Sequence, residues 1–292
     1  MTPPPLAAPL LQVENMRIAL AGAGASHNAV EEVSFEIGRG EAFGLVGESG
    51  CGKSITALAV MGLLRRPLSL AGGRIVLDGE EIQDASAAEM RRLRGKKIGM
   101  IFQEPMTALN PLSPVGRQIA EMFVLHQGAS WNEAMDRAEE SLRQVHVPSP
   151  ERRISDYPHQ LSGGMRKRTS LAQTLALDPD IILMDEPFSA LDIQTRQLME
   201  NEVLDLWAHK KKAVLFITHD LDEAIAMSDR VVVLSAGPAS HPIGEFSIDI
   251  PRPRDVAEIK ASARFIELHA AIWAVLRDEV LKGYAQQLQK AA

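Results

Sequence analysis

The chain has 292 residues, of which 46% are apolar and 24% are charged. This length and composition allow one large folded domain or two smaller ones and exclude a disordered chain. Asp and Glu total 38 against 31 for Lys and Arg, which gives a net charge of −7. A broad electrostatic attraction to nucleic acid or to an anionic membrane surface is therefore not expected. A polyanionic ligand has to be bound by positive charge concentrated in one place.

Cysteine usage and hydropathy indicate the compartment. The single cysteine, Cys51, excludes an intramolecular disulfide and any cysteine-based metal cluster, and it suits a reducing environment. The sequence contains no run of the roughly 18–20 apolar residues that span a membrane, and its first residues lack the basic stretch of a signal peptide. We expect a cytosolic protein that reaches a membrane only through a partner.

The first third of the chain predicts strands and one helix. After a tail of ten residues rich in Pro and Ala, alternation of apolar and polar residues predicts strands at Leu11–Leu20 and Ala29–Ile37. A short apolar strand at Glu41–Val46 then leads through a glycine-rich turn into a helix at Ile55–Leu64.

The rest of the chain predicts a helical insertion followed by alternating strands and helices. Between residues 105 and 161 the periodicity is helical, at Val115–Gln127 and Trp131–Val145. Continuous apolar strands then alternate with helices, which is typical of a parallel sheet covered on both faces. These strands are Ile181–Met184, Ala213–Thr218 and Arg230–Leu234.

The last part, from about Asp255, predicts a helix that packs on its own domain or on a second copy of the chain. The expected apolar stripe consists of Ile266, His269, Ile272, Val275 and Leu276.

The glycine-rich turn fits the pattern G-x-x-x-x-G-K-[ST] and lies between a predicted strand and a predicted helix. Small residues let the backbone wrap a phosphate, and the helix N-terminus adds partial positive charge. We expect Lys53 to reach the β- and γ-phosphates and the Ser54 hydroxyl to ligate Mg²⁺. The predicted nucleotide-binding loop comprises Gly47, Glu48, Ser49, Gly50, Cys51, Gly52, Lys53 and Ser54.

Cys51 lies inside this loop and near the predicted N-terminus of a helix. A helix N-terminus lowers the pKa of a thiol, so we expect a lowered pKa for Cys51. Alkylation of this thiol is then expected to block nucleotide binding, and ATP is expected to protect it.

An apolar strand ends in two acids, Asp185 and Glu186. The carboxyl ends of parallel strands form the ligand-binding edge of an α/β sheet. We expect Asp185 to hold Mg²⁺ and Glu186 to polarise the attacking water.

Further motifs follow in an order that resembles the ATP-binding cassette family, the ATPase subunits of ABC transporters. Leu161-Ser-Gly-Gly-Met165 is similar to the signature of that family, which separates it from other phosphate-loop NTPases. Gln103, the run Ser189-Ala-Leu-Asp192 and His219 match the remaining motifs, and the resemblance covers Leu11 to Pro251.

The resemblance implies a head-to-tail pair of cassettes, in which ATP on one phosphate loop is capped by the signature of the other subunit. Ser162, Gly163 and Gly164 would then present a hydroxyl and backbone N–H groups to the γ-phosphate. Gln103 would contact the metal or the water, and His219 would contact the γ-phosphate and orient the water. Asp192 would help to link the two sites across the dimer.

The sequence departs from the family pattern in two places. Residues 1–34 contain no aromatic residue to stack on adenine, so Leu20 or His27 would have to support the base. The signature continues as Met165-Arg-Lys-Arg168, where many relatives have glutamine in place of the Met or the Lys.

The two halves resemble different importers. Up to about Met165 the motifs are similar to ATPases of oligopeptide, dipeptide and nickel importers, and beyond it to those of nitrate, sulfonate and taurine importers. Natural recombination, an intermediate lineage and an engineered fusion all remain open. Either resemblance implies an importer, with an integral-membrane permease as direct partner and an extracytoplasmic solute-binding protein as indirect one. The subunit would lie on the cytoplasmic face of the membrane.

A soluble cassette ATPase that remodels a protein complex without transport is the alternative. No nucleic acid is expected as a partner, since the basic run Arg91-Arg-Leu-Arg-Gly-Lys-Lys97 carries no interleaved aromatic residues.

Motifs and elements together predict an α/β fold: a phosphate-loop NTPase (RecA-like) core with a mostly parallel sheet, an N-terminal antiparallel β subdomain and a helical insertion. The expected segments are 11–104 for the β subdomain and phosphate-loop part, 105–164 for the insertion, 165–245 for the second part of the core and 246–292 for the tail.

Overall fold

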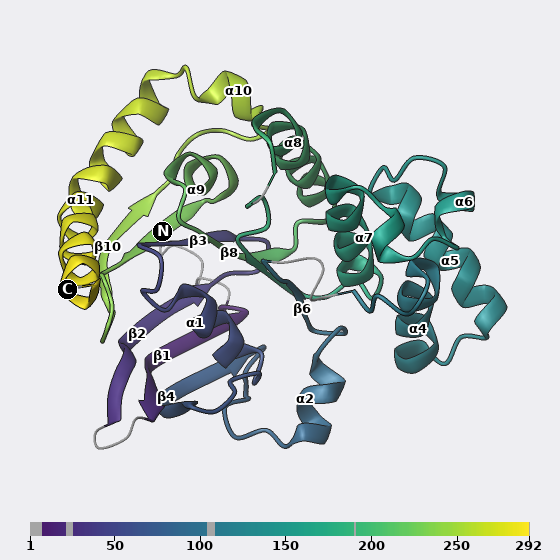
Figure 1. The fold of residues 1–292 in the computed structure, drawn as a ribbon, viewed down its shortest axis with the longest axis horizontal. Coiled ribbons are helices and arrows are strands. Elements are labelled where there is room, and N and C mark those ends of the chain that lie inside the picture. Colours follow the sequence, from purple (N-terminus) through teal and green to yellow (C-terminus); the bar gives the residue numbers. More distant parts are fainter. Residues whose placement is uncertain (1–7, 22–25, 104–108, 190, 292) are drawn as a thin grey trace, which may run out of the picture.

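Two β-sheets organise the part of the chain that a computed structural model describes, residues 8–21, 26–103, 109–189 and 191–291 (Figure 1). The smaller sheet is antiparallel, with the strand order β2-β1-β4-β5. In β1 buried side chains alternate with more exposed ones, because one face of the sheet packs on the core. The alternation shifts between Val13 and Met16, where the pairing with β2 is also irregular. The strands are β1 (Leu11–Ala21), β2 (Ser26–Ile37), β4 (Leu68–Leu77) and β5 (Glu80–Glu81).

The larger sheet has the order β10-β9-β3-β8-β7-β6, and every neighbouring pair except β10 with β9 is parallel. Every residue of β3, β7 and β8 is buried, as continuous apolar runs predict for strands covered on both faces. The predicted parallel core and N-terminal antiparallel sheet are both present. The strands are β3 (Ala42–Val46), β6 (Ile98–Ile101), β7 (Ile181–Asp185), β8 (Ala213–Thr218), β9 (Arg230–Leu234) and β10 (Pro242–Ser247).

Alternate residues of the central strands enter different cores. Phe43 and Leu45 pack with α1 (Lys53–Val60) and the antiparallel sheet, whereas Ala42 belongs to a second core under α8 (Ile193–Lys210). Helix α2 (Ala87–Leu93) precedes β6, and α9 (Leu221–Met227) follows β8. The layers on both faces keep the strands dry and fix the ends of β3, β6, β7 and β8 along one edge.

Helix α1 differs from the prediction at both ends. It starts two residues before the expected Ile55 and stops at Val60 instead of Leu64. Gly62, at φ 62°, adopts the left-handed conformation that ends helices, and its N–H bonds to the Ala59 carbonyl.

A helical region lies to the right of the large sheet in Figure 1. Helices α4 and α5 pack on each other and on α7, which leads back to the core. The predicted start of the insertion at residue 105 lies outside the described residues, as do residue 190 and most of the N-terminal tail. The elements are α4 (Val115–Gln127), α5 (Trp131–Gln144), α6 (Pro150–Arg153), the short 3₁₀ helix η1 (Pro158–Gln160) and α7 (Gly163–Leu175).

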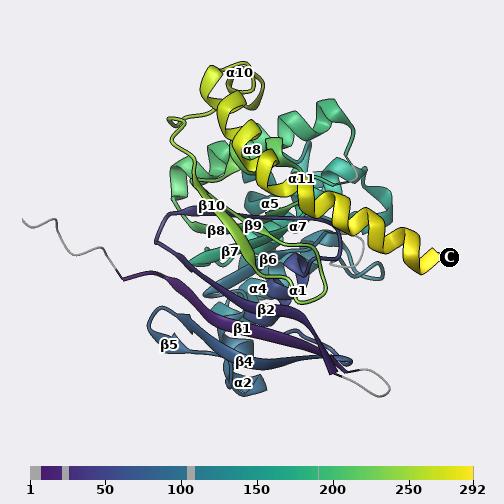
Figure 2. The ribbon, with the colours of Figure 1, turned by 90° about the vertical axis from the view of Figure 1, so that its left-hand side faces the viewer.

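The C-terminal part forms α10 (Val256–Ile259) and α11 (Ala263–Ala291), and α11 contacts α9 and β10. Figure 2 shows α11 running from α10 to the C-terminus. The predicted stripe is wrong at Ile266, which is 59% exposed, and at His269, which is not buried. The side chains that enter the core are Phe265, Leu268, Ile272 and Leu276, a spacing of three and four residues. No helix in the described part is long and apolar enough to cross a membrane.

Candidate functional site

The phosphate loop joins β3 to α1 and needs its glycines. A Cβ at Gly47 would lie 2.7 Å from Cys51 Sγ, and one at Gly52 would lie 2.6 Å from a methyl group of Val30. Gly50 and Gly52 also have φ of 84° and 99°, which L side chains rarely adopt. The loop can therefore wrap closely around a bound group only because these positions carry no side chain.

Lys53 lies in the middle of the loop and is 4% exposed. Its Nζ donates to the carbonyl oxygens of Gly47 at 2.8 Å and Glu48 at 2.9 Å. The ammonium group is thus positioned inside the loop as the first residue of α1, where a phosphate would also meet the helix N-terminus.

The predicted lowering of the Cys51 pKa is wrong. The thiol is 1% exposed, and this burial raises its pKa more than the neighbouring Lys53 ammonium lowers it. The side chain packs in the core with Val30 and Leu234, while the Cys51 carbonyl accepts a hydrogen bond from Ser240. The thiol is therefore part of the support beneath the loop, and the expected reactivity has to be revised.

Ser54 and Asp185 meet across the edge of the sheet. The Ser54 hydroxyl donates to Asp185 Oδ1 at 2.8 Å. Asp185 is 6% exposed, and burial raises its pKa despite this hydrogen bond. Two oxygen ligands on neighbouring corners of an octahedron with Mg–O bonds of 2.0–2.1 Å lie about 2.9 Å apart. The pair therefore fits Mg²⁺, which would also offset the cost of burying the carboxylate.

Glu186 is held between side chains from two other strand ends. Gln103, which follows β6, donates from Nε2 to Glu186 Oε2 at 2.8 Å. His219, which follows β8, places Nδ1 3.1 Å from Glu186 Oε1. The backbone of Glu186 has φ 44°, a conformation that is strained for a non-glycine residue and typical of functional sites. The structure thus brings together all three residues predicted to be catalytic.

The signature residues begin α7. Ser162 is the N-cap, and its Oγ accepts from the Met165 N–H at 3.3 Å. Ser162 and Gly163 are exposed. Within the described residues, no hydrogen bond or ion pair joins Ser162, Gly163 or Gly164 to the phosphate loop. The helix N-terminus is therefore presented outward, as a group that acts on another subunit must be.

Asp192 occupies a capping position. Its Oδ1 accepts from the Thr195 N–H at 3.0 Å at the start of α8, and this hydrogen bond lowers the pKa of the carboxyl group. The carboxylate thus has a structural role within its own helix, and its predicted role across a dimer is not tested by this contact.

Leu20 and His27 lie opposite each other on β1 and β2. Leu20 is 42% exposed, and His27 is also exposed. An aliphatic side chain and an imidazole ring are therefore neighbours on this edge, which leaves the predicted choice between them for adenine open.

Lys167 is a candidate functional residue for which no role was predicted from the sequence. It is 7% exposed on α7, and its Nζ donates to the carbonyl oxygens of Pro187 and Ser189, directly after Glu186. The only signal in the sequence was that many relatives have glutamine where the signature of this chain has Met165 or Lys167.

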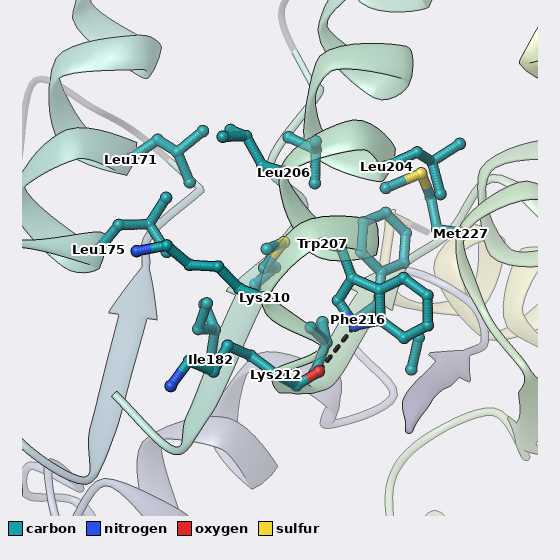
Figure 3. A pocket seen from close by; sticks show the side chains of 14 residues that line it. Leu171, Leu175, Ile182, Leu204, Leu206, Trp207, Lys210, Lys212, Phe216 and Met227 are labelled. Carbon is teal, nitrogen blue, oxygen red and sulfur yellow. Dashed lines mark hydrogen bonds between the residues drawn. The ribbon is translucent and has the colours of Figure 1, made fainter. Parts of the chain in front are cut away.

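A separate apolar cavity of about 40 Å³ lies between α7, α8 and the large sheet. Figure 3 shows Leu171 and Leu175 on one side, Trp207 and Phe216 on another, and Lys210 and Lys212 beside them. It is far too small for a nucleotide and is lined mainly by apolar side chains, so it is not a nucleotide site.

Comparison with known proteins identifies the family. The ABC transporter family model matches residues 30–189. A probable peptide ABC transporter ATP-binding protein of Sinorhizobium fredii is 42% identical over 229 residues, 78% of this chain and 68% of that protein. An oligopeptide transport ATP-binding protein of Lactococcus lactis is 41% identical over 228 residues, again 78% and 68%. The glutathione import ATP-binding protein of Escherichia coli is 43% identical over 240 residues, 79% of this chain but 38% of that protein.

A solved structure agrees with these relatives. A dimeric, post-hydrolysis ATP-binding cassette bound to ADP and Pi has a TM-score of 0.73 and 27% identity, and it covers 82% of this chain and 100% of its own. The fold and the family resemblance predicted from the motifs are confirmed. The chain therefore belongs to the ABC transporter family, as an ATP-binding cassette that hydrolyses ATP.

Proposed function

We propose that the chain is the ATPase motor of a peptide-type importer, in which Glu186 polarises the attacking water. The observation that carries this proposal is the carboxylate of Glu186, which is held by Gln103 and His219 beside the Ser54–Asp185 pair. A base held from two sides has a restricted orientation, and orientation lowers the entropic part of the barrier.

Mg²⁺ is the proposed metal, held by Ser54 and Asp185, with Gln103 as a further contact. The ion would neutralise charge on the β- and γ-phosphates. Lys53 would bind the same phosphates, and His219 would contact the γ-phosphate and keep the water aligned with Glu186. Within the described residues no cluster of three or more His, Cys, Asp or Glu side chains could hold a metal, which suits an ion that takes most of its ligands from phosphate and water.

Two cassettes are proposed to close head to tail around ATP. The exposed Ser162 and Gly163 at the start of α7 support this arrangement, because a hydroxyl, N–H groups and a helix N-terminus stabilise phosphate charge. Gly164 and Asp192 would complete the contact, and the dimeric state of the solved neighbour agrees with it. Closure would accompany ATP binding, and hydrolysis would reopen the dimer.

The names of the relatives support peptides as the class of cargo. We propose a peptide-type permease as the membrane partner and an extracytoplasmic binding protein that selects the solute. The subunit would then be peripheral, on the cytoplasmic face of the membrane. The resemblance of the second half to nitrate, sulfonate and taurine importers stays a prediction, and nucleic acid is not proposed as a partner.

The role of Glu186 is tested with Glu186→Gln, which keeps the shape of the side chain and removes the base. We expect ATP turnover to fall by at least ~100-fold, with ATP still bound and a closed ATP-loaded dimer accumulating. Steady-state turnover and size-exclusion chromatography with Mg-ATP provide the measurement. Glu267→Gln, a matched change on the exposed side of α11, should leave both unchanged. Undiminished turnover in Glu186→Gln would exclude the proposed base.

The class of cargo is tested by reconstitution. The chain should co-purify with a peptide permease and raise ATP-dependent peptide uptake into lipid vesicles. Stimulation by a nitrate- or sulfonate-type permease instead would reassign the cargo, and association with no permease would favour the complex-remodelling alternative.

A further inference from the structure

Lys167 connects two parts of the site that lie far apart in the sequence. It is five residues beyond Ser162 on α7, and its buried ammonium group donates to the Pro187 and Ser189 carbonyls. These carbonyls belong to the segment that directly follows Glu186. One side chain therefore joins the signature helix to the turn that carries the proposed base.

Hydrogen bonds and a buried ring hold the turn after Glu186 together. Ser189 bonds to the Glu186 carbonyl twice, from its N–H at 3.2 Å and from its hydroxyl at 2.8 Å. Between them Phe188 is fully buried and packs against Phe216, with the ring centroids 5.9 Å apart. A displacement of the Glu186 backbone therefore moves the carbonyls that Lys167 binds, because the segment has little freedom to absorb it.

In the proposed mechanism, Glu186 is the residue in this turn whose contacts respond to nucleotide. Its side chain has one contact each with Gln103 and His219, and its backbone is strained at φ 44°. When water and the γ-phosphate compete for these partners, the side chain has to pair again, and release of the backbone strain at Glu186 favours a movement of the turn.

We propose that Lys167 is a positioning residue that couples the Glu186 turn to the signature residues Ser162–Gly164 of the same subunit. The inference rests on the proposed function of Glu186 and extends it: the nucleotide at one site would adjust the signature that acts at the other site of the dimer. The ammonium group transmits the movement through its two carbonyl contacts and does not touch ATP.

The charges around Lys167 tune this link. Glu223 of α9, Arg196 of α8 and Glu186 after β7 all act on the ammonium group. Burial is the largest cause and lowers the pKa of Lys167 to about 8. Lys167 is therefore charged below pH 8 and neutral above it, and charge-assisted hydrogen bonds are roughly twice as strong as neutral ones.

Hydrogen exchange on the full chain tests the coupling without requiring turnover. In the native protein, Mg-ATP should slow amide exchange by about threefold or more both in residues 187–191 and in the first two turns of α7. Lys167→Met has similar length and no donor. At a dilution where size-exclusion chromatography shows the chain to stay monomeric, so that no second subunit covers α7, Mg-ATP should still slow exchange in 187–191 but leave α7 unchanged. Lys212→Met is the control, because Lys212 also donates to a backbone carbonyl, that of Asp178, yet lies away from the site.

The outcomes separate the inference from the proposed function. If α7 responds to Mg-ATP equally in Lys167→Met and the native chain, the coupling is wrong even though ATP binds. If Lys167→Met raises exchange in α7 to the same extent with and without ATP, Lys167 is merely structural. If Mg-ATP slows exchange nowhere in the native chain, the nucleotide site itself is wrong.

A pH profile provides an independent readout. Native ATP turnover should fall as the pH rises through about 8, whereas Lys167→Arg, which stays charged, should keep its turnover to pH 9.5. A profile of the same shape in both proteins would overturn the assignment.

Discussion

The Glu186 turn and the C-terminal segment around Arg254 are both held by polar contacts, but the partners of the Glu186 side chain are exposed whereas Arg254 is buried. Glu186 has one contact from Gln103 and one from His219, each from a different strand end. Arg254 donates to the carbonyls of Ile225, Ala226, Ser228, Ile248 and Ile250. A side chain held by single contacts can change one partner at a time, whereas a movement of Arg254 would leave five carbonyls without their donor. The first region is suited to changing partners during a reaction and the second to holding α9 and the segment after β10 in place.

The largest expected effect is on the C-terminal segment. Arg254→Met should lower the free energy of unfolding by about 3–5 kcal/mol, because buried carbonyls lose their donor together. Thermal and urea unfolding provide the measurement. Arg264→Met, which removes an exposed arginine that pairs with Asp249, should change stability little. Equal losses in the two variants would contradict the contrast between a buried network and a surface pair.

Glu200 lies on α8 between the two regions and sharpens the comparison. It is 1% exposed, and neither carboxylate oxygen has a hydrogen-bond partner among the described residues. Burial, followed by the charge of Glu223, raises its pKa to about 7. A carboxyl group with a raised folded pKa costs stability as pH rises from its unfolded value near 4.5, and the full cost is present above about pH 7.

Glu200→Gln should therefore stabilise the protein by on the order of 1–3 kcal/mol at pH 8 and by little at pH 5. Urea unfolding at both pH values measures this difference. A stability difference between variant and native chain that does not change with pH would show that Glu200 is not the titrating group. The same result would follow if a water molecule or a bound ion paired with the Glu200 carboxylate.

At the catalytic edge, the next effect concerns the metal. Ser54→Ala removes the hydroxyl that bonds to Asp185 at 2.8 Å, so the Mg²⁺ concentration for half-maximal turnover should rise by about 10- to 100-fold. Ser54→Thr keeps the hydroxyl and should stay within about threefold of the native value. The Mg²⁺ dependence of ATP turnover distinguishes the two variants, and an unchanged requirement in Ser54→Ala would remove Ser54 from the metal site.

Local sequence patterns predicted the helices and strands, whereas the side-chain contacts between them depend on long-range packing. The alternation in β1, the glycines of the phosphate loop and the apolar runs of β7 and β8 depend on neighbouring residues, so the sequence alone was sufficient. The convergence of Gln103 and His219 on Glu186 joins three strand ends and was predicted only through the family resemblance. No local pattern could have placed Lys167 against Pro187, because that contact spans 20 residues.

The wrong predictions have the same physical origin. Phe265 and Ile266 are both apolar, and which of them is buried depends on where β9, β10 and α9 lie beneath α11. A helix N-terminus suggested a lowered pKa for Cys51, but Val30 and Leu234 from other strands bury the thiol. The sequence shows which groups are present along the chain, whereas their burial depends on segments that are distant in the sequence and pack against them in the fold.

The smallest expected effect concerns the reactivity of Cys51. Because burial raises its pKa and the thiol is 1% exposed, iodoacetamide at pH 8 should modify it at least about tenfold more slowly than a small free thiol. Modification then requires the phosphate loop to open, so ATP should slow it further and the modified protein should lose ATP binding. Mass spectrometry of a time course measures the rate. Rapid alkylation that ATP does not slow would show that the phosphate loop is open in the absence of nucleotide. The packing of Cys51 beneath the loop would then be as easily broken as the contacts of Glu186 with Gln103 and His219.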